Sequence, residues 1–157
     1  MNDIYFERIL TPSDIELIKS WLEDPELLKM ARMRDNPLTE DEYSEYLHTL
    51  SFMVYVDGLA VGYARIYKTS DPEVMEIGMV IANAEYREKG LGYAIGKRLL
   101  GVTKELGAKI VYWATSDYNY PSIKLAKKLG FKFDKCLPEI VVTGNEKHDA
   151  LIYKLEI

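Results

Sequence analysis

The stretch that most constrains the fold runs from residue 76 to residue 106. The apolar, β-branched run Glu76–Ala82 is followed by a polar turn and then by two glycines, Gly90 and Gly92, that stand one residue apart. The next segment has apolar residues at helical spacing, namely Leu91, Ala94, Ile95, Leu99, Val102 and Leu106. We therefore predict a strand, a glycine turn and a long helix in this order, with these apolar residues on the buried face of the helix.

The predicted turn suits an anionic ligand. The first backbone N–H groups of a helix have no partner within the helix, and the aligned peptide dipoles leave partial positive charge there. Arg87 and Lys89 add full positive charges beside the glycines. A phosphorylated ligand is therefore favoured over a neutral one. For the two glycines alone, a plain tight turn into a packed helix is the alternative.

Two common phosphate loops do not match this turn. The dinucleotide fingerprint requires a third glycine three residues after Gly92, where Ile95 stands. The P-loop requires Lys and Ser or Thr directly after its second glycine, but Gly92 is followed by Tyr93 and Ala94. A nucleotide-binding α/β protein of either kind is therefore disfavoured.

A third phosphate loop does match. The pyrophosphate loop of the GCN5-related N-acetyltransferase (GNAT) family, Arg/Gln-x-x-Gly-x-Gly/Ala, resembles Arg87-Glu88-Lys89-Gly90-Leu91-Gly92 at each defined position. Further on, Asp117–Ser122 runs into Leu125–Phe131, which is similar to the Asn-x-x-Ser/Ala segment of the family and its Lys-Leu-Gly-Phe ending. Two motifs in order are more specific than either alone. The resemblance covers roughly residues 50 to 155.

The resemblance implies the acyl-CoA N-acyltransferase (GNAT) fold. This is an α/β (α+β) fold with a mixed central sheet of about seven strands, helices on both faces and the order β-α-α-β-β-β-α-β-α-β-β. The chain pattern agrees, with a strand over residues 3–9 and helices over 13–22, 25–33 and 40–50. Thr11 and the Thr39/Glu42 capping box mark two helix starts, and Asp57-Gly58 marks a hairpin. We expect one N-acetyltransferase domain over residues 1–157.

Acyl transfer to an amine requires a base, because an amine with a pKa of about 10 is mostly protonated at neutral pH. Acidic residues at or near the position of Glu76 serve as the base in several members of the family, so Glu76 is the candidate; an exposed strand-end glutamate is the alternative reading. The resemblance assigns the pantetheine arm and the oxyanion to the backbone of Val80, Ile81 and Ala82. It assigns the cofactor phosphates to the loop residues Arg87, Glu88, Lys89, Gly90, Leu91, Gly92 and Tyr93.

The acid that protonates the leaving thiolate is less evident. Many members of the family place a tyrosine three residues before the residue equivalent to Leu129, but this chain has Ala126 there. Ser122 is the expected substitute and is also expected beside the cofactor, and Tyr118 or Tyr120 are alternatives. With a thiol pKa of about 8.5, the thiolate can also leave unaided.

Asn119 is expected to hydrogen-bond the cofactor arm. The alternative is that its side chain caps the helix that follows.

Composition excludes several classes of partner. The formal net charge of −5 and the pI near 5.1 argue against a nucleic-acid surface. They also slightly favour a cationic acceptor, although mild acidity commonly serves solubility alone. No apolar run approaches the roughly 20 residues that span a bilayer, so no membrane partner and a cytoplasmic location are expected. One cysteine and two well-separated histidines predict neither an internal disulfide nor a metal site.

The resemblance implies an acetyl-CoA-dependent N-acetyltransferase that works by direct attack of the acceptor amine in a ternary complex. The Glu-Ile-Gly strand, the Asn-x-x-Ser segment and the tail Glu139–Tyr153 most resemble the ribosomal-protein and polyamine acetyltransferase branch. The acceptor is expected to be a small cationic amine or a protein N-terminus, and the resemblance allows a homodimer. The alternative is a non-catalytic acyl-CoA-binding module, which Ala126 supports.

Overall fold

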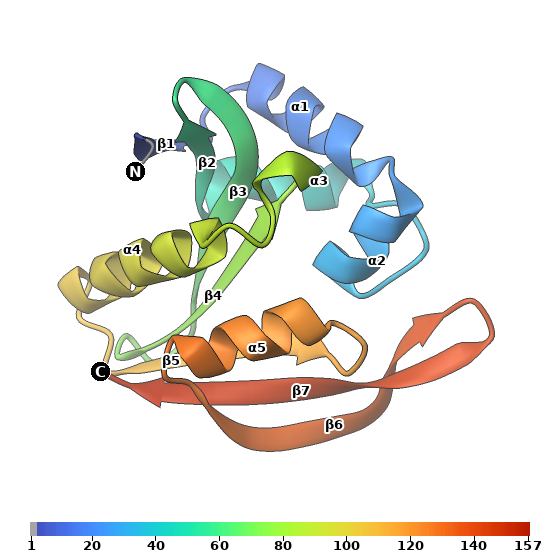
Figure 1. Cartoon of the computed structure of the whole chain (residues 1–157), viewed down its shortest axis with the longest axis vertical. Coiled ribbons are helices and arrows are strands. Elements are labelled where there is room, and N and C mark those ends of the chain that lie inside the picture. The colour runs from blue at the N-terminus through green and yellow to red at the C-terminus, as the bar shows by residue number, and fades with distance from the viewer. Residues whose placement is uncertain (1–2) are drawn as a thin grey trace.

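The computed structural model describes residues 3–157 and builds them on one seven-stranded sheet with helices on both faces (Figure 1). The order of strands across the sheet is β1-β2-β3-β4-β5-β7-β6, and the neighbouring pairs run antiparallel except β4 and β5. The strands are β1 (Ile4–Arg8), β2 (Leu50–Val56), β3 (Leu59–Lys68), β4 (Val74–Ile81), β5 (Ile110–Ser116), β6 (Lys132–Thr143) and β7 (Glu146–Glu156). The predicted fold class is confirmed.

The helices follow the predicted order with one addition. Between β1 and β2 the structure has three helices, as the three helical ranges expected from the chain pattern indicate, whereas the order that the resemblance implies has two; Asp24 ends one helical segment and caps the next. The helices are α1 (Pro12–Leu22), α2 (Pro25–Arg32), α3 (Glu40–His48), the short 3₁₀ helix η1 (Ala84–Tyr86), α4 (Leu91–Glu105) and α5 (Tyr120–Lys128). No helix within residues 3–157 is both long and apolar enough to cross a membrane.

Local signals predicted the helix starts well. The Thr11 hydroxyl accepts the Asp14 amide at 3.4 Å, and Thr39 and Glu42 form both hydrogen bonds of the capping box, at 2.9 and 3.2 Å. Helix α3 ends at His48 rather than at Leu50. The reason is tertiary, because Leu50 already pairs with Ile66 of β3.

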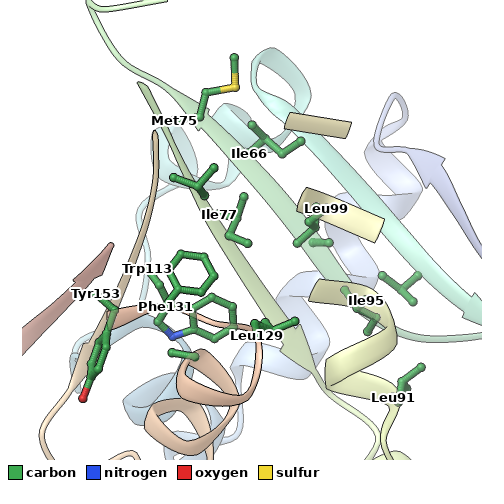
Figure 2. Packing of buried hydrophobic residues seen from close by; sticks show 14 of the residues in the cluster. Ile66, Met75, Ile77, Leu91, Ile95, Leu99, Trp113, Leu129, Phe131 and Tyr153 are labelled. Carbon is green, nitrogen blue, oxygen red and sulfur yellow. The ribbon is translucent and has the colours of Figure 1, made fainter. Parts of the chain in front are cut away.

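The larger hydrophobic core lies between the sheet and helices α4 and α5. Figure 2 shows Ile77 of β4 near Leu99 and Ile95 of α4, with Trp113 of β5 beside Phe131. Their ring centroids are 5.6 Å apart. Leu106, predicted to be on the buried face, is 42% exposed because α4 ends before it. The residues of α4 that are buried are Leu91, Ile95, Gly96, Leu99 and Thr103.

A second core lies on the opposite face of the sheet, under helices α1, α2 and α3. Side chains alternate between the faces along a strand. Ile66 of β3 therefore packs in the α4 core, whereas Tyr63 of β3 and Val80 of β4 pack with Tyr46 of α3. This alternation decides which side chains of β3 and β4 face α1–α3.

Candidate active site

The sheet opens between its only parallel pair of described strands. Strands β4 and β5 are paired over Val74–Glu76 and Ile110–Tyr112, and beyond these residues they are no longer in register. Strand β4 continues beside β3, while β5 continues beside β7. Figure 1 shows the two halves of the sheet diverging from this point. The opening leaves part of one edge of β4 without a neighbouring strand.

The open edge of β4 offers backbone N–H groups to a ligand. Successive N–H groups of a strand point to opposite sides, and the Ala82 amide donates toward β3, to the Val61 carbonyl at 2.8 Å. By this alternation, the N–H of Val80 also points to β3, whereas those of Met79 and Ile81 point to the open edge. The donor role of Ile81 stays a prediction, and the same geometry extends it to Met79. The donor role predicted for the Val80 backbone is corrected, because its N–H points to β3 and not to the open edge. For Ala82 it is corrected, because its N–H is already bound.

The glycine turn ends in a helix start that no side chain caps. Gly90 is the N-cap of α4, has φ 82°, and provides no side-chain acceptor for the first amides of the helix. A Cβ built at Gly90 would meet nothing within 4 Å, so the space beside it is open. Glu88 also has a positive φ, 59°. This arrangement fits the predicted phosphate site, since the first-turn amides of Leu91, Gly92 and Tyr93 can bind an anion.

The two positive side chains of the loop do different things. Arg87 folds back onto the end of β4, where its Nε donates to the Ile81 carbonyl at 2.8 Å and its Nη2 to the Ala82 carbonyl at 3.1 Å. Arg87 therefore fixes the loop on the strand as well as adding charge. Lys89 lines a cavity of about 470 Å³ beside the loop, together with Ile4, Val56, Glu85, Tyr86, Gly90, Leu91 and Ala94.

Gly92 has a packing role that the motif alone does not reveal. A Cβ at this position would lie 3.0 Å from Cδ2 of Leu125 in α5. The neighbouring Tyr93 also faces α5, because Nζ of Lys128 lies 4.8 Å from its ring centroid. The second glycine therefore lets α4 and α5 approach each other next to the loop.

Glu76 stands where β4 and β5 separate. It is the last residue of β4 that pairs with β5, opposite Tyr112, and it lies beside Tyr67 of β3. Its carboxylate has no hydrogen bond or ion pair to any residue of the described chain, 3–157. Burial raises the pKa of Glu76 above its ordinary value. A half-buried carboxylate with a raised pKa and no partner is suited to accept a proton.

Ser122 is held at the same opening by a residue that the motifs did not identify. The indole Nε1 of Trp113, the first residue of β5 beyond the paired segment, donates to the Ser122 hydroxyl oxygen at 3.0 Å. This bond leaves the hydroxyl proton of Ser122 available to a ligand. The geometry is compatible with the predicted role of Ser122 as proton donor.

The other polar side chains of this segment are already engaged. Asn119 is the N-cap of α5: its Oδ1 accepts the Ser122 amide at 3.3 Å, and its Nδ2 donates to the Met30 carbonyl at 3.4 Å. The cap given as the alternative for Asn119 is therefore formed, and its contact with the cofactor arm stays a prediction. The Tyr118 hydroxyl donates to the Lys29 carbonyl at 2.7 Å. Tyr120 is 74% exposed.

Ala126 lies in the core and provides no acid. It is 0% exposed and packs with the α4 and α5 cluster. Within residues 3–157 there is also no group of three or more His, Cys, Asp and Glu side chains that could hold a metal ion. Of the side chains predicted to act in catalysis, the structure therefore leaves Glu76 and Ser122 at the opening, beside the backbone of β4.

Sequence reasoning missed four residues near this opening. Met79 and Trp113 are apolar residues of strands β4 and β5, to which no motif assigns a role. Gly78 and Arg65 face each other across β3 and β4 on the side of helices α1–α3. A signal for Arg65 was present, because it is the single charged residue inside the apolar run Leu59–Tyr67.

Comparison with known proteins agrees with the fold. A family model described as the acetyltransferase (GNAT) family matches residues 15–131. The solved spermidine N-acetyltransferase from Vibrio cholerae, in complex with CoA and spermine, is similar with a TM-score of 0.84 and 15% identity over 98% of this chain and 95% of that one. The structure of yncA from Salmonella typhimurium with its cofactor acetyl-CoA has a TM-score of 0.81 and 19% identity, over 99% and 94%. An acetyltransferase (GNAT family) from Bacillus anthracis has a TM-score of 0.78 and 20% identity, over 99% and 98%.

Proposed function

The chain belongs to the acetyltransferase (GNAT) family of enzymes, and on this premise we propose that it transfers the acetyl group of acetyl-CoA directly to the amine of an acceptor. The observation that carries the proposal is the position of Glu76. Its unpartnered carboxylate stands at the separation of β4 and β5. Residues 1–157 are taken as one N-acetyltransferase domain.

The geometry supports a division of the cofactor between two parts of the site. The uncapped start of α4, with the open space at Gly90, supports binding of the phosphates. From Glu76 to Ile81, β4 extends over about 17 Å, and its open edge offers the amides of Met79 and Ile81. An extended pantetheine arm can therefore lie along this edge as an added strand, with its thioester near Glu76.

Each proposed step uses a group of this chain. Glu76 accepts a proton from the acceptor ammonium, and the freed nitrogen forms a bond to the thioester carbonyl carbon. The N–H groups of the open β4 edge stabilise the oxyanion. When the carbon–sulfur bond breaks, Ser122 gives its proton to the thiolate and regains one from solvent. The nitrogen loses its second proton to solvent, which leaves a neutral amide, and Glu76 releases to solvent the proton that it accepted. No covalent acyl-enzyme forms.

The acceptor class is the finer part of the proposal. Sequence patterns favour the ribosomal-protein and polyamine branch, hence a small cationic amine or a protein N-terminus. The similar Vibrio cholerae structure holds spermine, which supports an amine as the acceptor. The cytoplasmic location and the homodimer stay predictions.

The proposal is tested by release of free CoA thiol from acetyl-CoA across a panel of polyamines, amino acids, aminoglycosides and N-terminal peptides. Turnover with one class supports the proposal and identifies the acceptor. In parallel, CoA at 100 times its dissociation constant should stabilise the protein by about 2.7 kcal/mol. Stabilisation without turnover by any amine would instead favour the non-catalytic module, for which the buried Ala126 is the supporting observation. Absence of both would refute the proposal.

A further inference from the structure

A buried arginine without an acidic partner lies on the sheet face that carries Glu76. Arg65 of β3 is 3% exposed. Its Nε donates to the Ser51 hydroxyl at 3.2 Å and its Nη2 to the Thr49 hydroxyl at 3.1 Å. Both partners are neutral, and no carboxylate of residues 3–157 forms an ion pair with Arg65. Buried charges in proteins are normally paired, so binding of an anion beside this guanidinium would be favourable.

A second arginine approaches the same place from α2. Arg32 is half-buried, and its Nη1 donates to the Tyr46 hydroxyl at 2.8 Å. The guanidinium carbons of Arg65 and Arg32 lie 4.0 and 5.9 Å from the centroid of the same Tyr46 ring. Arg32 too forms no ion pair with a carboxylate of the described residues. Two positive charges therefore lie against one aromatic ring, and a bound anion would reduce the repulsion between them.

A neighbouring arginine, Arg34, does form an ion pair with an acidic residue. Arg34 follows α2 closely, and its guanidinium forms an ion pair with Glu42 and donates to the carbonyls of Asn36 and Pro37. Arg34 therefore has a complete structural role. The lack of an acid at Arg32 and Arg65 is a local property of this face, in a chain whose net charge is −5.

Strand β4 leaves room beside Arg65. The residue in register with Arg65 is Gly78, and a Cβ there would contact only the Tyr67 side chain, at 3.6 Å. Glu76 is two residues before Gly78 on the same face, a separation of about 6.6 Å along the strand. The candidate base and Arg65 therefore stand on the same face of neighbouring strands, near the point where β4 and β5 separate.

Aromatic rings hold the cation in place before any ligand arrives. The Arg65 guanidinium carbon lies 4.0 Å from the Tyr46 ring centroid and 4.8 Å from that of Tyr67. The Tyr46 hydroxyl donates to that of Tyr63 at 3.1 Å. A guanidinium positioned in this way loses little freedom when it binds a planar acid group.

Building on the proposed acetyl transfer, we propose that the acceptor carries an acidic group a few atoms from its reactive amine, and that this group binds Arg65 and Arg32 while the amine reaches Glu76. The acceptor class is therefore an amino acid or a similar amine with a carboxylate, rather than a polyamine. The acidic net charge of the whole chain pointed the other way. It does not describe the charges inside this site.

The test compares acceptors that differ only in the acid. CoA thiol release is measured at saturating acetyl-CoA with L-methionine against L-methioninamide, 4-aminobutyrate against 4-aminobutyramide, and spermine. A charge-assisted hydrogen bond changes affinity about 10- to 100-fold. We expect kcat/KM for one acid to exceed that for its amide by at least about 10-fold. Equal use of acid and amide, or preference for spermine, would overturn the proposal.

Variants show whether the arginines cause the preference. Arg32→Gln and Arg65→Gln are expected to raise KM for the acid about 10-fold or more, with no change for the amide or for CoA binding. Arg34→Gln is the matched control and should keep the preference. If Arg65→Gln does not fold, Arg32→Gln alone decides. Equal losses for acid and amide would leave the arginines only a structural role and refute the proposal.

A binding measurement decides the case in which no acceptor of the panel is turned over. CoA-saturated protein is titrated calorimetrically with N-acetyl-L-methionine and 4-acetamidobutyrate, the products from the acids. Binding that Arg32→Gln weakens about 10-fold supports the proposal. Absence of binding by both overturns it. These results are distinct from failure of the acetyltransferase proposal, in which the protein neither binds CoA nor acetylates any amine.

Discussion

Replacing Glu76 by Gln should separate catalysis from stability. The Glu76 carboxylate has no hydrogen bond or ion pair within residues 3–157, so the amide loses no contact of the described structure. Burial raises the pKa of Glu76, which means that its ionised form opposes folding at every pH above its ordinary value of 4.5. Removing the charge should therefore leave the free energy of unfolding at pH 7 unchanged or higher.

The activity of the same variant should fall steeply. A positioned general base contributes about 10²- to 10⁴-fold to a rate, which is about 2.7 to 5.5 kcal/mol of transition-state free energy. We expect Glu76→Gln to lower kcat by this factor with CoA affinity unchanged. The acidic limb of the pH–rate profile should also disappear, because its ionising group is gone.

The assay is initial-rate CoA thiol release across pH, with urea denaturation of the same samples. Glu73→Gln is a matched control, because Glu73 lies just before β4 and pairs with Lys109 at the surface. It should keep wild-type turnover. If Glu76→Gln turns over like wild type with the same pH profile, Glu76 is a strand-end glutamate and not the base.

Three further predictions follow from the same geometry. Gly62→Ala places a Cβ 2.0 Å from a backbone carbonyl oxygen of β4, so the free energy of unfolding in urea should fall by about 1–3 kcal/mol. At Gly101 of α4, a Cβ meets nothing within 4 Å. Gly101→Ala should therefore raise the free energy of unfolding, by up to about 1 kcal/mol. Gly90→Ala forces a side chain into φ 82° and should weaken CoA binding measured by calorimetry; unchanged affinity would refute the loop assignment. The hydrogen bond from Arg34 lowers the pKa of Glu42 from 4.5 to about 2. Its stabilisation is present above about pH 5 and is lost toward pH 2, so Glu42→Gln should lower Tm at pH 7 but not at pH 2.

Local sequence signals predicted the helices and turns, because the hydrogen bonds that start or end these elements join residues close in sequence. The capping box of Thr39 and Glu42 and the turn Asp57-Gly58 involve residues close in sequence, and both form as expected. Asn119 is instructive, because the cap and the ligand contact compete for one side chain. The local interaction, the cap, is formed, and the ligand contact stays a prediction.

The rest depended on contacts between distant parts of the chain. The bond between Ala82 and Val61 is set by the register of β3 and β4, which no local pattern encodes. Register also places Arg65 opposite Gly78. The fold brings both Arg65 and Arg32 to the Tyr46 ring. Whole-chain charge does not report how charges are distributed within one face of the sheet, and the cationic acceptor that it favours stays a prediction.

The most direct test of acetyl transfer in a ternary complex is an initial-rate analysis in which acetyl-CoA and an acceptor that turns over are varied together. Direct attack predicts intersecting double-reciprocal lines and one acetylated acceptor for each CoA released. Parallel lines, which indicate a covalent acetyl-enzyme, would contradict the mechanism, and CoA release without acetylated product would contradict the transfer itself.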